Sequence, residues 1–225
     1  MNILVVSDIH NDIENILSYM DKIVMLDFDL VVCPGDFTDV TMPKGFTAVD
    51  IGKLIIEELS GLGKPILALP GNLDKEIIPL LESEKISLHG SGRIISGVGF
   101  YGFGGAKTPF STSFEPEEGE IKTGLEQGFE KIKNAKIKVQ VTHNPPARTK
   151  VDLLYTGAHV GSEAVRKFIE EKQPAVAISS HIHEARGTDE LGKTKLINSG
   201  RFPEGYCGLV TIKKNAVTTK IINLI

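Results

Sequence analysis

Apolar runs alternate with helical patterns along the first third of the chain. Residues 3–7, ILVVS, have the pattern of a fully buried strand, and the apolar positions after it recur at a helical spacing as far as residue 25. The same order of strand and helix returns at 29–36 and 47–63, and a third strand at 64–74 precedes a short amphipathic stretch. This alternation predicts an α/β fold with a parallel sheet.

The pattern changes in the middle of the chain. Residues 93–106 contain two short strands around a glycine turn, which predicts a mixed sheet or the start of a second sheet. The elements expected next are a helix at about 119–134, a strand at 137–142, a helix at 161–173 and a strand at 175–179. The tail from residue 193 alternates in strand fashion and predicts antiparallel strands that close the structure. A tail strand at a sheet edge would allow a homo-oligomer.

Composition narrows the class of protein. The chain has 225 residues, 41% hydrophobic and 24% charged, without a linker-like segment, so we expect a single domain over residues 1–225. Trp is absent and aromatic residues make up only 6%, which predicts an aliphatic core. The net charge of −4 argues against a general nucleic-acid binder, because such proteins need a basic face.

The first residues and the cysteines bear on location. The start of the chain lacks the basic and apolar regions of a signal peptide, and no apolar run approaches the length of a membrane span. Cys33 and Cys207 cannot form a disulfide framework and have no metal-binding spacing. We therefore expect a cytoplasmic protein that does not engage a membrane.

Side chains that can bind metals stand just past the predicted buried strands. They are Asp8, His10, Asp36, Asn72, His143, His181 and His183. In open α/β sheets, sites form at the carboxyl ends of parallel strands. The sequence therefore predicts that these residues meet at one edge of one sheet.

Each of these residues has an ordinary explanation when it stands alone. An Asp after a strand commonly caps a helix, Gly-Asp and Gly-Asn are frequent turn dipeptides, and a lone His often makes a hydrogen bond at a strand end. Together, two carboxylates, one amide and four imidazoles suit Mn²⁺, Fe, Zn²⁺ or Co²⁺. Seven ligands are too many for one ion with an open position, whereas two ions that share Asp36 would each have four.

The order of these motifs resembles that of a known enzyme family. The chain contains D-x-H, G-D-x-x-D, G-N, a lone His and H-x-H in this order between residues 8 and 183. This order resembles the calcineurin-like metallophosphoesterase superfamily, and the segments at 102–121, 141–150 and 157–171 resemble its small prokaryotic Icc-related members. The resemblance implies a four-layer αββα sandwich, an α/β fold with two mixed sheets flanked by helices.

The resemblance also implies a ligand set and a reaction. Asp8, His10 and His183 would bind one ion, Asn72, His143 and His181 would bind the other, and Asp36 would bridge them. We expect two divalent ions, Mn²⁺ first, with Fe, Zn²⁺, Co²⁺ or Ni²⁺ as alternatives. A hydroxide that bridges the ions would attack the phosphorus atom of a small phosphate ester.

Leu73 departs from the family pattern. Many members have His at this position, which stabilises the transition state or protonates the leaving group, and Leu can do neither. Phosphodiesters with good leaving groups are therefore expected over monoesters. Asp39, which supports that His in such enzymes, has no such partner here, and the alternative is that it is only a turn or surface residue. Ser180 replaces the usual Gly before H-x-H and would be strained if its φ were positive.

Three residues in the loops are candidates to compensate for the missing His. His159 in GAHVGS is the candidate acid, and with Asp36 and His143 it completes the catalytic residues that we expect. Arg148 and Lys107 are candidates to hold phosphate, since guanidinium groups bind it in a bidentate manner. The alternative is that all three are solvent-facing loop residues or helix caps.

Two other functions stay open. A catalytically weak, metal-binding scaffold for protein interaction is compatible with Leu73, although intact histidines argue against it. A nuclease on the same core is disfavoured by the acidic balance.

Overall fold

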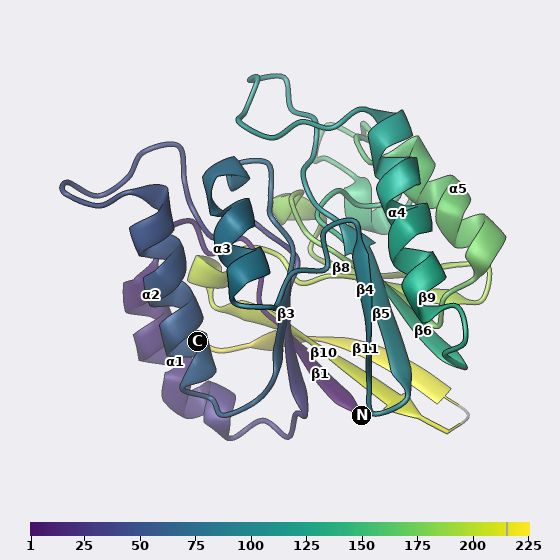
Figure 1. Ribbon diagram of the computed structural model, residues 1–225, viewed down its shortest axis with the longest axis horizontal. Coiled ribbons are helices and arrows are strands. Elements are labelled where there is room, and N and C mark those ends of the chain that lie inside the picture. The colour runs from purple at the N-terminus through teal and green to yellow at the C-terminus, as the bar shows by residue number, and fades with distance from the viewer. Residues whose placement is uncertain (215) are drawn as a thin grey trace.

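The computed structural model of the chain describes residues 1–214 and 216–225 (Figure 1). The strands are β1 (Asn2–Val5), β2 (Leu30–Cys33), β3 (Ile66–Ala68), β4 (Ser91–Ile95), β5 (Val98–Phe103), β6 (Ile137–Thr142), β7 (Val176–Ser179), β8 (Gly187–Leu191), β9 (Thr194–Asn198), β10 (Tyr206–Lys213) and β11 (Ala216–Asn223). The α-helices are α1 (Ile13–Val24), α2 (Ala48–Ser60), α3 (Ile78–Ser83), α4 (Glu118–Ile132) and α5 (Glu163–Lys172). Short 3₁₀ helices are η1 (Lys75–Ile77), η2 (Lys150–Asp152), η3 (His183–Ala185) and η4 (Phe202–Glu204).

The strands form two mixed sheets. The five-stranded sheet has the order β11-β10-β1-β2-β3, in which β1, β2 and β3 are parallel and the β10–β11 hairpin is antiparallel to β1. The six-stranded sheet has the order β4-β5-β6-β7-β9-β8, and its neighbours from β5 to β9 are parallel. In Figure 1, α1, α2 and α3 lie on one side of the paired sheets and α4 and α5 on the other. The four-layer αββα sandwich implied by the sequence is confirmed.

Three apolar layers hold the sandwich together. Successive side chains of a strand point to opposite faces, so Leu4 packs towards α1 and α2 while Ile3 and Val5 pack between the sheets. In the other sheet, Phe100 lies between the sheets, and Tyr101 packs under α4 and α5. The expected aliphatic core is present, because the layer between the sheets consists mainly of Val, Ile and Leu.

Local signals set the helix boundaries next to the strand ends. Helix α1 begins after Asp12, whose carboxylate accepts a hydrogen bond from the Asn15 N–H. Helix α2 begins with a capping box between Thr47 and Asp50, and Gly61 ends it. Among residues 1–214 and 216–225, no helix has both the length and the apolar character needed to cross a membrane.

Two expectations about the sheets are wrong. The strand-end residues do not share one sheet, because β1, β2 and β3 belong to the five-stranded sheet and β6 and β7 to the six-stranded one. The tail is not wholly antiparallel, since β9 pairs in parallel with β7. Strand β8 was not predicted, and its sequence GTDEL alternates between partly buried and exposed positions at a sheet edge.

Candidate metal centre

The seven predicted ligands occupy the loops that follow five parallel strands. Asp8 and His10 follow β1, Asp36 follows β2, Asn72 follows β3, His143 follows β6, and His181 and His183 follow β7. The two sheets bring their carboxyl ends to the same end of the sandwich. The ligand-type side chains therefore meet between the sheets rather than along one of them.

Six of these side chains form two compact groups. Asp8, His10 and His183 make up one group, and Asp36, His143 and His181 make up the other. Within each group, one potential ligand atom per residue lies within 4.8 Å of the others. Asn72 adjoins the second group, because its Oδ1 lies 2.9 Å from Nε2 of His143.

Asp36 lies between the two groups. Its Oδ2 is 3.8 Å from Nε2 of His10 in the first group and 3.5 Å from Nε2 of His143 in its own group. From this position the Asp36 carboxylate can contact an ion in either group.

The spacing and the unpartnered atoms fit bound cations. Two ligand atoms that are each 2.1 Å from an ion at a tetrahedral angle lie about 3.4 Å apart. The Nε2 atoms of His10 and His183 are 3.2 Å apart and face each other. Oδ2 of Asp8 is buried without a hydrogen-bond partner among the described residues, as expected for an oxygen whose partner is an ion.

The backbone is left-handed at several of these residues. The φ angles are 51° at Asp8, 51° at His10, 52° at Asp36 and 70° at His181. Non-glycine residues in this region store strain and occur preferentially at functional sites. Ser180 has no positive φ, so the expected strain falls on His181 instead, and this turn lets His181 and His183 face the same site.

Contacts around His143 orient its ring. Nδ1 lies 2.9 Å from the Pro34 carbonyl oxygen and 2.9 Å from the Ser180 hydroxyl. A hydrogen on Nδ1 donates to Pro34, which leaves Nε2 directed towards Asp36 and Asn72. The Ser180 side chain thus serves the site, a role that its position in the motif did not reveal.

Asp74 ties together the loops that carry Asp36 and Asn72. Its buried carboxylate accepts hydrogen bonds from the backbone N–H groups of Phe37, Thr38 and Gly71 at 3.0, 2.9 and 2.8 Å. Burial raises the pKa of Asp74, and the neighbouring Asp36 adds to the effect. The G-N-x-D spacing is a signal for this role that the sequence analysis did not use.

Burial and charge set the protonation of the ligand groups. Burial raises the pKa of Asp8 to about 7 and lowers the pKa of His181 to about 3 and of His183 to about 4. Although burial opposes both charges, Asp36 and His143 stabilise each other, so the pKa of Asp36 is lowered and that of His143 is raised to about 9. The metal-free site thus holds protons that a cation must displace.

The other three predicted residues lie outside the two ligand groups. The Lys107 ammonium pairs with Glu117. The Arg148 guanidinium pairs with Glu163 on the surface. These two cations are therefore engaged elsewhere.

His159 pairs with a buried carboxylate. Its Nδ1 lies 2.7 Å from Oδ1 of Asp152, and its side chain is 37% exposed. Asp152 also accepts hydrogen bonds from the backbone N–H groups of Arg148, Thr149 and Gly161. An Asp that orients a partly exposed imidazole is compatible with an acid and with a loop-stabilising pair.

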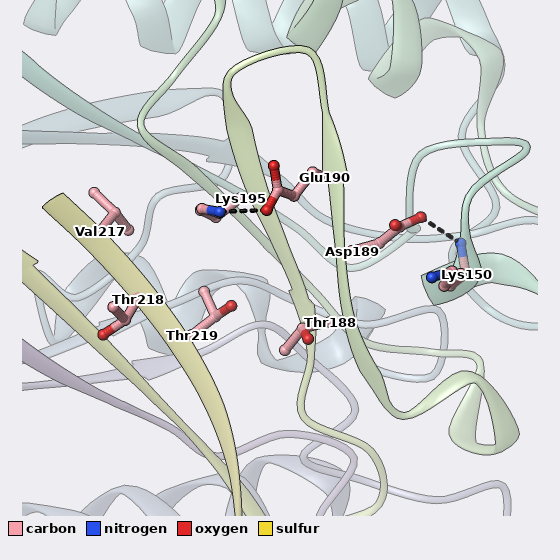
Figure 2. A pocket seen from close by; sticks show the side chains of 8 residues that line it. All are labelled: Lys150, Thr188, Asp189, Glu190, Lys195, Val217, Thr218 and Thr219. Atoms are coloured by element: carbon pink, nitrogen blue, oxygen red, sulfur yellow. Dashed lines mark hydrogen bonds and ion pairs between the residues drawn. The ribbon is translucent and has the colours of Figure 1, made fainter.

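A cleft of about 580 Å³ elsewhere on the protein holds none of the predicted ligands. Figure 2 shows it between β8, β9 and β11. Three of its charged side chains already have partners, because Glu190 pairs with Lys195 and Asp189 accepts a hydrogen bond from the Lys150 backbone N–H. The ligand groups at the strand ends are therefore the stronger candidate site.

Comparison with protein families agrees with this geometry. The family model described as calcineurin-like phosphoesterase matches residues 1–185. The chain belongs to the calcineurin-like phosphoesterase family. Membership supports a hydrolase of phosphate esters, and members of this family typically bind divalent metal ions.

Relatives of this phosphoesterase include proteins of known and unknown activity. The uncharacterized protein MJ1162 of Methanocaldococcus jannaschii is 36% identical over 84% of this chain and 88% of its own length. TT1561 of Thermus thermophilus has a TM-score of 0.70 at 18% identity, with 100% of this chain and 99% of that chain covered.

Two further proteins of known structure are described by an activity. A dimetal phosphatase from Danio rerio has a TM-score of 0.64 at 12% identity and covers 100% of this chain and 96% of its own. A novel archaeal phosphodiesterase has a TM-score of 0.55 at 18% identity, with 99% and 100% covered. At these identities, the likeness establishes the shared fold.

Proposed function

We propose that this protein is a phosphodiesterase that works with two divalent ions. The observation that carries the proposal is the position of Asp36 between the two ligand groups, with Oδ2 within 3.8 Å of His10 and 3.5 Å of His143. The first ion would be held by Asp8, His10, His183 and Asp36, and the second by Asn72, His143, His181 and Asp36. Mn²⁺ is the ion proposed for both positions.

Two bound divalent ions supply a water activated as a nucleophile and neutralise charge on the phosphoryl oxygens. The chain's own residues hold and orient these ions. Asp8 and Asp36 offset only part of the added charge, so the site becomes positive and attracts a phosphoryl group despite the acidic protein. The Pro34 carbonyl keeps Nε2 of His143 pointed into the site.

Leu73 supports the preference for diesters. Its side chain cannot donate a proton, and loss of a general acid slows a reaction by about 10²–10⁴-fold. A diester with a good leaving group does not need that proton. His159 is proposed as the residue that protonates poorer leaving groups, and Asp152 fixes its ring. Arg148 and Lys107 remain predicted phosphate contacts, and each would first have to leave its ion pair with a Glu.

The remaining proposals concern partners and location. A net charge of −4 favours small substrates over nucleic acid. Strand β11 forms an edge of the five-stranded sheet, so a homo-oligomer through this edge is kept as a proposal for sedimentation analysis. The free, buried Cys33 and Cys207 favour a reducing compartment, and we propose a cytoplasmic location, which cell fractionation tests.

Hydrolysis of bis(p-nitrophenyl) phosphate beside p-nitrophenyl phosphate tests the function. Metal-stripped protein is assayed with and without Mn²⁺. The Asp36→Asn variant is expected to lose ~10²–10³-fold or more of the activity, because it removes the charge shared by both ions. Asp21→Asn, a change at an exposed carboxylate of α1, is the matched control and should retain full activity.

The outcomes separate the alternatives. Diester turnover that requires Mn²⁺ and is lost in Asp36→Asn supports the proposal. A monoester preference contradicts the argument from Leu73, and His159→Gln is then the variant to test. If two Mn²⁺ ions bind but neither ester is hydrolysed, the scaffold function replaces the enzyme as the better hypothesis.

A further inference from the structure

A second cleft adjoins the candidate metal centre. It has a volume of about 380 Å³, within the range of about 300–1,000 Å³ typical of small-molecule sites. One wall comes from the loop between β2 and α2, the other comes from the loop between β5 and α4, and Leu73 lies in the segment after β3. In Figure 1 the two loops project from the same end of the molecule.

Hydrogen bonds connect the cleft directly to candidate ligands. The Leu73 N–H donates to Oδ1 of Asp36 at 3.2 Å. The Asn72 amide nitrogen donates to the Thr112 hydroxyl, also at 3.2 Å. The cleft is thus one residue or one hydrogen bond away from Asp36 and Asn72. If a phosphate is held at the metal centre, the organic group esterified to it has the cleft beside it.

The wall formed by the loop after β5 is organised before any substrate binds. The Phe114 N–H and the Ser113 hydroxyl both donate to the Asn72 carbonyl, at 2.9 and 3.1 Å. Within the loop, Oε1 of Glu115 accepts hydrogen bonds from the Thr108 and Thr112 hydroxyls, each at 2.7 Å. A preformed wall reduces the ordering that binding would otherwise require.

The lining combines apolar side chains with negative charge. Leu73, Val40 and Phe110 contribute to it, and the last two are 80% and 83% exposed. Asp39 and Glu76 supply two carboxylates, and among the described residues no Lys or Arg lines the cleft. Large apolar side chains gathered on an exposed surface mark a binding site. Because of its two carboxylates, this cleft would repel an anion.

We propose that this cleft binds the organic group of the substrate, and that this group is aromatic or otherwise apolar and carries no negative charge. The inference rests on the proposed phosphodiesterase function and specifies its substrate class. Diesters with an uncharged aryl or similar flat group fit the cleft. Polyphosphates and nucleic-acid chains, whose further phosphates would meet Asp39 and Glu76, do not.

Binding of unactivated diesters tests the inference without relying on turnover. Isothermal titration of the Mn²⁺-loaded protein compares dimethyl phosphate, diphenyl phosphate and bis(4-carboxyphenyl) phosphate. We expect diphenyl phosphate to bind at least tenfold more tightly than either of the others. Phe110→Ala should weaken diphenyl phosphate binding roughly three- to tenfold and leave dimethyl phosphate unchanged.

Two further variants sharpen the comparison. Phe46→Ala removes an aromatic side chain of the loop between β2 and α2 that is 46% exposed but does not line the cleft, and it should change none of the affinities. The double variant Asp39→Asn, Glu76→Gln should improve binding of the carboxylated diester about tenfold. If Phe110→Leu is as weak as Phe110→Ala, apolar contact is not the cause and the inference is wrong.

The results distinguish this inference from the function beneath it. Equal affinity for the three diesters, with Asp36→Asn abolishing all binding, would overturn the inference and leave the phosphodiesterase intact. No binding of any diester to the Mn²⁺-loaded protein would count against both. The expected order, narrowed three- to tenfold in Phe110→Ala and unchanged in Phe46→Ala, supports both.

Discussion

At the scale of single residues, the protons held by Asp8 and His143 link metal binding to pH. Burial raises the pKa of Asp8 to about 7, and the nearby Asp36 carboxylate raises the pKa of His143 to about 9 although burial opposes this. A cation needs the ionised carboxylate and the neutral imidazole, so binding expels both protons. The affinity for Mn²⁺ should therefore rise with pH between about 6 and 9.

Titration calorimetry in two buffers of different ionisation enthalpy measures this release. We expect roughly 1.5 protons released at pH 7 and fewer than about one at pH 8.5, where Asp8 is already ionised. Asp8→Asn should reduce the release at pH 7 by roughly half a proton. An affinity that does not change with pH, without proton release, would show that these residues do not bind the ion.

Asp74 is the second residue whose role can be measured directly. Asp74→Asn replaces an oxygen by an amide group that faces the backbone N–H donors of Phe37, Thr38 and Gly71. Leaving buried donors unpaired should lower the free energy of unfolding by about 2–4 kcal/mol, measured by urea denaturation of the metal-free protein. Asp21→Asn, on the exposed face of α1, should stay within about 0.5 kcal/mol of the parent. Equal stability of the two variants would contradict the role assigned to Asp74.

At the scale of elements, the loops after β2 and β3 approach too closely for a side chain at Gly71. A Cβ atom there would lie 2.0 Å from Oδ1 of Asp36 and 2.3 Å from its backbone nitrogen. Gly71→Ala should displace Asp36 and weaken Mn²⁺ binding at least tenfold in a titration. Gly119→Ala, in α4 with nothing within 4 Å of its added Cβ, is the matched control. Similar Mn²⁺ affinities for both variants would show that the loop contact does not position the ligand.

These elements also show what sequence patterns can and cannot predict. Apolar runs locate β1, β2 and β7, and the polar residues after them identify the candidate ligands, because burial and strand ends leave local signals. The pairing of strands leaves no such signal, so the pattern at residues 93–106 left a mixed sheet and a second sheet both open, and the resemblance to a family favoured two sheets. Strand β8 escaped prediction because an edge strand with charged residues lacks an apolar face. The G-N-x-D spacing marks Asp74, but its contacts with Phe37 and Thr38 in another loop depend on tertiary structure.

At the scale of the whole molecule, the candidate site depends on both sheets and on the chain beyond the family match. Strand β10 pairs with β1 and β9 pairs with β7, so residues after 185 flank two of the strands that carry ligands. Figure 1 shows the hairpin of β10 and β11 in yellow beside β1. Val210 and Ile212 are buried in the layer between the sheets. The tail thus belongs to the same core as the ligand-bearing strands, which supports the proposal of a single domain.

Removal of the tail tests this proposal. A chain of residues 1–185 loses β8 to β11, which leaves β1 and β7 each with only one of its two neighbouring strands and exposes the apolar layer between the sheets. We expect this shortened chain to lack a cooperative urea transition and to bind no Mn²⁺. Ile212→Val is the matched control in the same layer and should keep one transition, with the unfolding free energy lowered by about 0.5–1.5 kcal/mol. A shortened chain that unfolds cooperatively and binds Mn²⁺ would show that the tail is a separate unit and that the single-domain proposal is wrong.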